Sequence, residues 1–292
     1  MSRFASILLP LDGSSEAAKG AGCALWLANA TGATLHVLNA TAHPLSAGDA
    51  LARLRAAGAQ GAACVVVHQP PGSAEAAVLE EIAAHRIDLV VMSARGESTQ
   101  ANHALSHRLG PVARAVVEHS PAPVILLPAH YRESLPWTSM LAASSGEAVA
   151  DQALAVAAQL AAALRLRVTV VHAEYRVRAA GARQLGGYAD APHHEVRHRL
   201  EELVRPALTW CTTDEAGCVG DVLLRRGEPA SVLLDEAARH RSSVLALGWH
   251  GALGPGRALV LKRLLDHAEC ALLLARGGEH PSARLKVDSE ID

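Results

Sequence analysis

The stretch Glu80–Met92 reads EEIAAHRIDLVVM, and the stretch Asp235–Leu247 reads DEAARHRSSVLAL. The second stretch follows the first at an offset of 155 residues without a gap, so an acidic pair, a His-Arg pair and an apolar run coincide in order. The match continues beyond these stretches, because Gly96 falls on Gly251 at the same offset. Agreement among so many residue types indicates an internal repeat.

The repeat extends through both halves of the 292-residue chain, with small shifts in register. Near the front, Ile7–Leu11 pairs with Met140–Ser144, and near the end Val124–Leu127 pairs with Leu272–Ala275. The sequence therefore predicts two domains, at residues 1–130 and 138–276, with a linker at 131–137 and a polar tail at 277–292.

Each half alternates short apolar runs with longer helical patterns. In the first half the expected strands are Ser6–Leu11, Ala33–Leu38, Ala63–His68, Leu89–Ser93 and Val124–Leu127, and the expected helices are Glu16–Ala30, Ala47–Ala57, Ala74–His85 and Val112–Glu118. Unbroken apolar strands separated by helices are typical of a parallel sheet covered on both faces. The predicted fold class is α/β, with two tandem, doubly wound, Rossmann-like domains, each a five-stranded parallel sheet with helices on both faces. Ligands of such sheets bind at the carboxyl ends of the strands.

Composition and charge argue against several classes of protein. The formal net charge is -2 with both signs mixed along the chain, so no basic stripe favours a nucleic-acid partner. The apolar start Ile7–Leu9 is interrupted by Pro10 and Asp12, and is too short for a signal peptide or a membrane span. Five cysteines without a framework spacing favour reduced thiols. We therefore expect a soluble, cytoplasmic protein.

Several motifs resemble the universal stress protein family. The stretch Ile7–Ala17 (ILLPLDGSSEA) is similar to the family's first strand and turn, and Asp88–Gly96 (DLVVMSARG) to its fourth strand and phosphate loop. The stretch His119–Leu126 (HSPAPVIL) resembles the fifth strand with its preceding prolines, and Leu247–Gly251 (LGWHG) resembles the loop in the second half. The resemblance covers both halves in order and implies a tandem, two-domain member of the family.

The same resemblance implies a strand contact and a nucleotide site. Family members dimerise through the last strand, which implies that Val124–Leu127 contacts Leu272–Ala275 as an internal pseudo-dimer, with a homodimer as a further alternative. One subgroup binds ATP at a loop of the form Gly-x2-Gly-x9-Gly-Ser/Thr, in which glycines let backbone N–H groups approach the phosphates. The acidic residue after the first strand, here Asp12, would accept a hydrogen bond from the nucleotide's sugar or base.

The first half departs from this loop while keeping parts of it. Its candidate nucleotide-binding residues are Asp12, Ser93, Arg95, Gly96 and Gly110. Ser93 stands where the leading glycine belongs, and thirteen residues separate Gly96 from Gly110. The hydroxyl position that follows is a proline, which has neither a hydroxyl nor a backbone N–H. A structural alternative stays open, in which Asp12 and the next residues form only a turn and a cap for the first helix.

The second half keeps different parts of the loop. Gly248 and Gly251 complete the set of candidate nucleotide-binding residues. Ala258 and Leu259 occupy the Gly-Ser position with only six residues between them and Gly251, and Ser145, or Ser144 if the register slips, replaces the acid of the first strand. Neither half holds the complete site, and each hydrogen bond lost to a charged phosphate costs about 1.5–3 kcal/mol.

Two histidine patterns bear on metal binding. His194, Glu195 and His198 form a His-Glu-x-x-His motif, a spacing that binds zinc when a third ligand converges. A solvated helix face is the favoured alternative. His85 and His240 end matching helices and are interpreted as caps of helix carbonyls. We assign no metal ligand from the sequence.

The sequence predicts a non-enzymatic stress-response protein that senses a ligand and has degenerate nucleotide sites, with no catalytic residues. Two alternatives stay open: an ATP-binding, slowly hydrolysing switch that uses the first half, and a binder of an apolar metabolite or lipid. No cofactor is firmly assigned, and ATP is the candidate. Backbone N–H groups converging with Arg108 or Arg114 would favour the switch, whereas a pocket lined by aliphatic side chains would favour the apolar binder.

Overall fold

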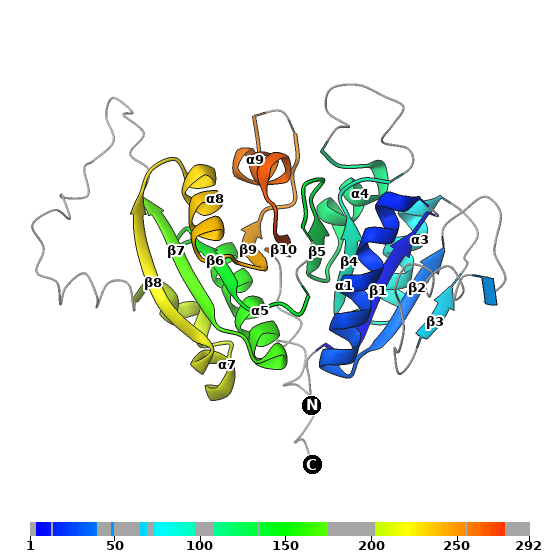
Figure 1. Cartoon of the computed structure of the whole chain (residues 1–292), viewed down its shortest axis with the longest axis horizontal. Coiled ribbons are helices and arrows are strands. Elements are labelled where there is room, and N and C mark those ends of the chain that lie inside the picture. The colour runs from blue at the N-terminus through cyan, green and yellow to red at the C-terminus, as the bar shows by residue number, and fades with distance from the viewer. Residues whose placement is uncertain are drawn as a thin grey trace, which may run out of the picture.

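The described part of the chain forms a single mixed α/β body (Figure 1). A computed structural model describes residues 4–12, 14–39, 48–49, 65–68, 73–96, 108–132, 135–174, 202–254 and 256–277. Within them, one ten-stranded sheet has the order β3-β2-β1-β4-β5-β10-β9-β6-β7-β8. The strands of the first half are β1 (Ser6–Leu11), β2 (Thr34–Asn39), β3 (Val65–His68), β4 (Leu89–Ser93) and β5 (Val124–Leu127). Those of the second half are β6 (Met140–Ser144), β7 (Val168–Glu174), β8 (Val219–Arg226), β9 (Val244–Trp249) and β10 (Ala271–Arg276).

The two halves have the same strand order. Each half reads third, second, first, fourth and fifth strand, and every pairing inside a half is parallel. Strand order reverses between β1 and β4 in the first half and between β6 and β9 in the second. The predicted doubly wound fold is thus confirmed, and each half has one switch point where ligands bind in such sheets.

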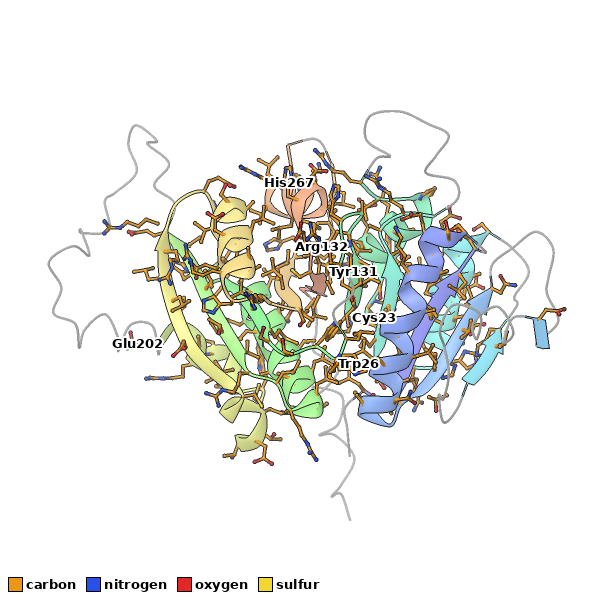
Figure 2. The ribbon with its side chains drawn as sticks, in the orientation of Figure 1. Cys23, Trp26, Tyr131, Arg132, Glu202 and His267 are labelled. Carbon is orange, nitrogen blue, oxygen red and sulfur yellow. The ribbon has the colours of Figure 1, made fainter. Side chains whose placement is uncertain are left out.

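The halves join through their last strands. β5 and β10 pair antiparallel, with Ile125 opposite Leu273 at the centre of the pairing. This confirms the contact predicted between the last strands. This contact between β5 and β10, called the seam below, continues into the connection after β5. There the backbone N–H of Arg132 donates to Glu269 O at 2.9 Å, and the Arg132 guanidinium pairs with the Glu269 carboxylate at 2.7 Å. Tyr131 and Arg132 lie where the two halves meet (Figure 2).

Helices cover both faces of the sheet. They are α1 (Ser15–Thr31), α3 (Ala74–Ala84), α4 (Pro111–His119), α5 (Ala148–Leu164), α7 (Thr213–Gly217), α8 (Pro229–Arg239) and α9 (Leu259–His267), with a further helix at 202–208. One core cluster joins α1 and α5 to one face, and a second joins α3, α4, α8 and α9 to the other. Strand residues alternate between the two clusters, so that Ile125 enters the first and Leu126 the second.

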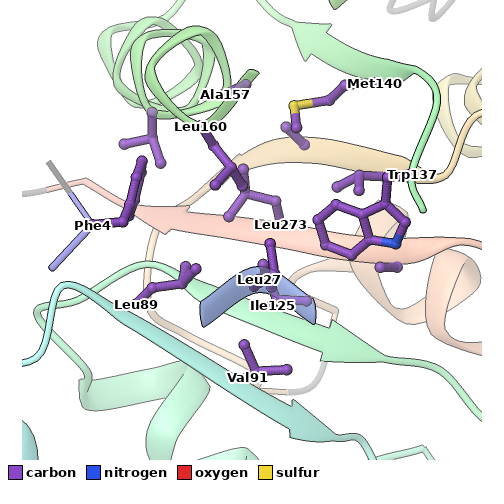
Figure 3. Close-up of a cluster of buried hydrophobic side chains, with 14 of the residues drawn as sticks. Phe4, Leu27, Leu89, Val91, Ile125, Trp137, Met140, Ala157, Leu160 and Leu273 are labelled. Carbon is purple, nitrogen blue, oxygen red and sulfur yellow. The ribbon is translucent and has the colours of Figure 1, made fainter. Parts of the chain in front are cut away.

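The first cluster runs across the seam without a break. It contains Leu27 and Val91 from the first half together with Leu160 and Leu273 from the second (Figure 3). Because one core serves both halves, they fold against each other rather than as separate bodies.

The expected strands and helices of the first half agree with the structure to within two residues at each described end. Two expected elements are described only in part. The structure describes residues 48–49 of the expected helix Ala47–Ala57 and residues 65–68 of the expected strand Ala63–His68. The proposed linker at 131–137 falls between β5 and β6. No helix in the described ranges has both the length and the apolar character needed to cross a bilayer.

Replacing Leu273 tests the shared core. Leu273 is fully buried at the seam, so Leu273→Ala should lower the free energy of unfolding by about 2–5 kcal/mol. Leu259→Ala is the control, because Leu259 is 67% exposed and its loss should change stability by no more than about 0.5 kcal/mol. Urea unfolding measures both, and similar losses in the two variants would contradict a core that spans the seam.

Candidate functional site

Each half has a cavity at the carboxyl ends of its strands, next to its switch point. In the first half the cavity has a volume of about 60 Å³ and is lined by the ends of β1 and β4 and by the start of α4. In the second half it has a volume of about 570 Å³ and is lined by the ends of β6, β7 and β9 and by the starts of α8 and α9. The two copies of one fold therefore present very different spaces.

The structure brings the five first-half candidates together. Asp12, Ser93, Arg95, Gly96 and Gly110 all line the small cavity. Oδ1 of Asp12 accepts from the backbone N–H of Ser14 at 2.9 Å, and Oγ of Ser14 accepts from Ala17 N at 3.0 Å, so this segment is also the turn and cap of α1. A Cβ on Gly96 would lie 2.3 Å from Oδ2 of Asp12, so a side chain at this position would require the carboxylate to move.

Several groups that would hold a phosphate in this half are already engaged. The hydroxyl of Ser93 donates to Glu16 O at 2.6 Å. The backbone N–H of Gly110 donates to Ala94 O at 2.8 Å, and Pro111 begins α4 without an N–H. The Nε atom of Arg95 is buried and donates to no group among the described residues.

Neither Arg108 nor Arg114 completes a phosphate site. Nε of Arg108 donates to both carboxylate oxygens of Asp266 on α9, at 2.6 and 2.8 Å, and this hydrogen bond raises the pKa of Arg108. Arg114 pairs with Glu118 one turn later on α4, at 3.3 Å. The ion pair between Arg108 and Asp266 joins the two halves, so Arg108 contributes to the contact between them.

The large second-half cavity has mainly aliphatic walls. Its apolar lining residues are Ala143, Val149, Ala150, Val171, Ala173, Pro229, Leu233, Leu247, Trp249, Ala252, Ala258, Leu259, Val260 and Leu261. Gly248 also lines it, whereas Gly251 does not. Pockets of this size and character hold small molecules in many proteins.

A few polar groups interrupt these walls. Oγ of Ser144 is buried and has no hydrogen-bond partner among the described residues. Glu147 and His250 face each other at 3.3 Å and are both exposed, so they lie toward solvent. Arg257 precedes α9, whose N-terminus receives no hydrogen bond from a capping side chain. The pocket thus combines a wide apolar wall with one unused buried hydroxyl and one cation.

Gly248 serves the packing of the second half. A Cβ at this position would lie 2.3 Å from Val149 O in the first turn of α5. The matching residue of the first half is Ser93, and the matching carbonyl is that of Glu16, which accepts the serine hydroxyl. The helix carbonyl at this position therefore accepts a hydrogen bond from a hydroxyl in the first half, and packs directly against the strand backbone in the second half.

Trp249 connects the pocket to the first half and was not among the site residues predicted from the sequence. Its indole lines the pocket, while Nε1 donates to Val117 O at the end of α4 at 2.8 Å. Nearby, the backbone N–H of Leu253 donates to Glu118 at 3.1 Å. The repeat held the signal that could have identified Trp249. At the repeat offset of 155 residues, this tryptophan stands where the first half has Ala94, in a chain with only 3% aromatic residues.

The histidine motifs have different outcomes. His194, Glu195 and His198 lie outside the described residues. His85 and His240 are the C-cap residues of α3 and α8, where their backbone N–H groups, not their rings, bond helix carbonyls. Their rings, however, lie beside the carboxylates of Glu81 and Glu236 on their own helices.

Comparisons with known proteins agree with this architecture. A family model described as the universal stress protein family matches residues 42–128 and 137–276. A universal stress protein from Archaeoglobus fulgidus has a similar structure, with 15% identity and a TM-score of 0.63 over 94% of this chain and 99% of that one. A protein of unknown function from Pseudomonas aeruginosa is similar at 18% identity and a TM-score of 0.60, over 94% of this chain and 92% of that one. Among curated proteins, none matches this chain.

Gly248→Ala tests the close approach of β9 to α5. The added methyl group would overlap a backbone carbonyl that cannot move freely, so the free energy of unfolding should fall by about 1–3 kcal/mol. Gly254→Ala is the matched control, because a Cβ there meets no atom within 4 Å and should change stability by no more than about 0.5 kcal/mol. If chemical denaturation finds the two variants equally stable, Gly248 is not needed for packing.

Proposed function

Because the chain belongs to the universal stress protein family, we propose that it is a non-enzymatic, ligand-sensing protein of the stress response. Its working site is the second-half pocket, and its ligand is a small amphiphile with an apolar body and one polar head. The observation that carries this proposal is the contrast between a mainly aliphatic cavity of about 570 Å³ and a cavity of about 60 Å³ at the equivalent place in the first half.

The walls of the pocket suit an apolar body. Val149, Val171 and Leu247 present aliphatic groups from three different elements, α5, β7 and β9. Apolar surface that a ligand buries against them contributes about 25 cal/mol per Å². An acyl chain or a similar hydrocarbon group matches this lining better than a triphosphate does.

The polar groups of the pocket suit a single head group. The Ser144 hydroxyl is buried without a partner among the described residues, and an unused buried hydroxyl costs free energy until a ligand bonds it. Arg257 offers a positive charge beside the uncapped start of α9, where backbone N–H groups favour an anion. A carboxylate or similar anionic head fits these two features.

Sensing, rather than turnover, fits the chemistry of the pocket. A serine acts as a nucleophile only when a base lies within hydrogen-bond reach, and Ser144 has no such partner in the described ranges. Trp249 forms one wall of the pocket and donates across the seam to Val117 O. A ligand that packs against Trp249 therefore favours the arrangement of the two halves in which Trp249 donates to Val117 O.

A second candidate is an ATP-binding switch in the first half. One observation favours it, because the buried Nε of Arg95 has no partner among the described residues and lies in the same cavity as Asp12. Against it, Ser93 and Gly110 already donate their hydrogen bonds to backbone carbonyls. Each missing charged hydrogen bond costs about 1.5–3 kcal/mol, so we expect ATP affinity no tighter than millimolar.

Mass spectrometry of what the protein carries tests the proposal directly. The chain is purified without added ligand, denatured, and extracted with both water and an organic solvent. We expect an amphiphile in the organic phase in amounts close to the protein, and no stoichiometric nucleotide. Stoichiometric ATP or ADP would overturn the proposal and favour the switch in the first half.

A variant that fills the pocket tests its location. Ala143→Leu places extra carbon atoms in the second-half pocket and should weaken binding of a dansyl-labelled fatty acid by about tenfold or more, a loss of about 1.4 kcal/mol. Ala74→Leu is the control, because Ala74 lines the first-half cavity instead. Fluorescence titration of the full chain measures both. Equal affinities in the two variants would place the probe elsewhere.

A further inference from the structure

Three histidines and a glutamate converge in the first half, away from both cavities. They are His36 on β2, His68 on β3, and Glu81 and His85 at the end of α3. None of them lines either pocket. We propose that His68, Glu81 and His85 bind a divalent transition-metal ion such as Zn²⁺, and that His36 holds His68 in position.

The three donor groups are already close enough to share an ion. One ligand atom of each residue lies within 4.8 Å of the other two. Oε2 of Glu81 lies 2.6 Å from Nδ1 of His85 and 3.5 Å from Nδ1 of His68. Donor atoms about 2.1 Å from a tetrahedral zinc ion lie about 3.4 Å apart, so small side-chain rotations complete the site.

The Glu81 carboxylate is not satisfied by these neighbours through hydrogen bonds. Its Oε2 atom is buried, yet it has no hydrogen-bond partner among the described residues, even with two imidazole nitrogens nearby. A cation between the three groups would satisfy this oxygen.

His36 gives His68 the orientation that a ligand needs. Nδ1 of His36 lies 3.0 Å from Nε2 of His68, on the opposite side of the His68 ring from Glu81. When Nε2–H of His68 donates to His36, Nδ1 of His68 carries the lone pair that faces Glu81. Histidine ligands of metals are commonly fixed in this way through the other ring nitrogen.

The second half surrounds the equivalent glutamate with different groups. Glu236 corresponds to Glu81 in the repeat, and its carboxylate pairs with the guanidinium of Arg225 at 2.8 Å and also with Arg239. In the first half, alanine stands at the position that matches Arg239. The groups that surround Glu81 in the described residues are imidazoles, which bind metal ions where guanidinium groups cannot.

The donor set and its surroundings suit zinc. Two imidazole nitrogens and one carboxylate oxygen are a known ligand set for Zn²⁺, with the fourth position left for water. His85 is 38% exposed, whereas His68 and Glu81 are each below 15%, so an ion can enter past His85 and then be largely enclosed. This site does not depend on the ligand proposed for the second-half pocket.

The test is zinc binding by the untagged full chain after treatment with a chelator. Isothermal titration should show one strong site per chain. His85→Ala and Glu81→Gln should each weaken this site by more than about 100-fold, because each removes a direct ligand. His240→Ala is the matched control at the equivalent position of the second half, and should bind as the unaltered chain does. Circular dichroism confirms that each variant is folded.

Two further variants distinguish this site from zinc binding elsewhere on the chain. His36→Ala should weaken zinc binding by about 10–100-fold, and His36→Asn, which keeps an acceptor atom, should restore much of it. The double variant His194→Ala and His198→Ala removes the His-Glu-x-x-His motif and should leave the strong site intact. The proposal is overturned if the unaltered chain binds no zinc, or if binding survives in His85→Ala and is lost in the double variant.

Discussion

The antiparallel pairing of β5 with β10 is the contact on which the rest of the structure depends. Each half would otherwise end its parallel sheet in an apolar strand with one row of unpaired backbone groups, which is a site for aggregation. Pairing the two edges satisfies these groups and makes one continuous sheet. It also allows a single hydrophobic cluster to pass under both halves. The pocket depends on this seam as well, because Trp249 is held by a carbonyl of α4 in the other half.

The two halves have the same backbone fold and differ in the side chains at matching positions. At the end of the fourth strand of each half, Ser93 hydrogen-bonds a helix carbonyl, whereas Gly248 packs directly against the equivalent one. In the next position, alanine in one copy is tryptophan in the other. On the outer helix, a glutamate meets two imidazoles in the first half, and two guanidinium groups with one imidazole in the second. The duplicated fold thus carries an apolar pocket in one half and a histidine cluster in the other.

These differences explain why the candidate nucleotide residues are not a sufficient guide to the site. Asp12, Ser93, Arg95, Gly96 and Gly110 do gather around one cavity, as the order of strands in this fold requires. The hydroxyl of Ser93 and the N–H of Gly110, however, donate to backbone carbonyls that sequence spacing does not identify. In the second half, Gly248 lines the large pocket and is needed for packing, while Gly251 lies outside the lining. The motif residues therefore locate the edge of the sheet where both cavities lie, and the packing around them sets the size and lining of each cavity.

The sequence by itself determined the repeat, the α/β class and the order of elements, and its resemblance to the family implied the pairing of the last strands. The first three features follow from local patterns, because apolar runs and helical periods are repeated along the chain. Only the tertiary structure decided the size of the two cavities, the role of Trp249 and the meeting of His36, His68, Glu81 and His85. The histidines illustrate the reason, since they come from three elements separated along the chain and have no spacing that a sequence motif records. Which side chains meet is set by strand register and helix packing, and these are properties of the whole fold.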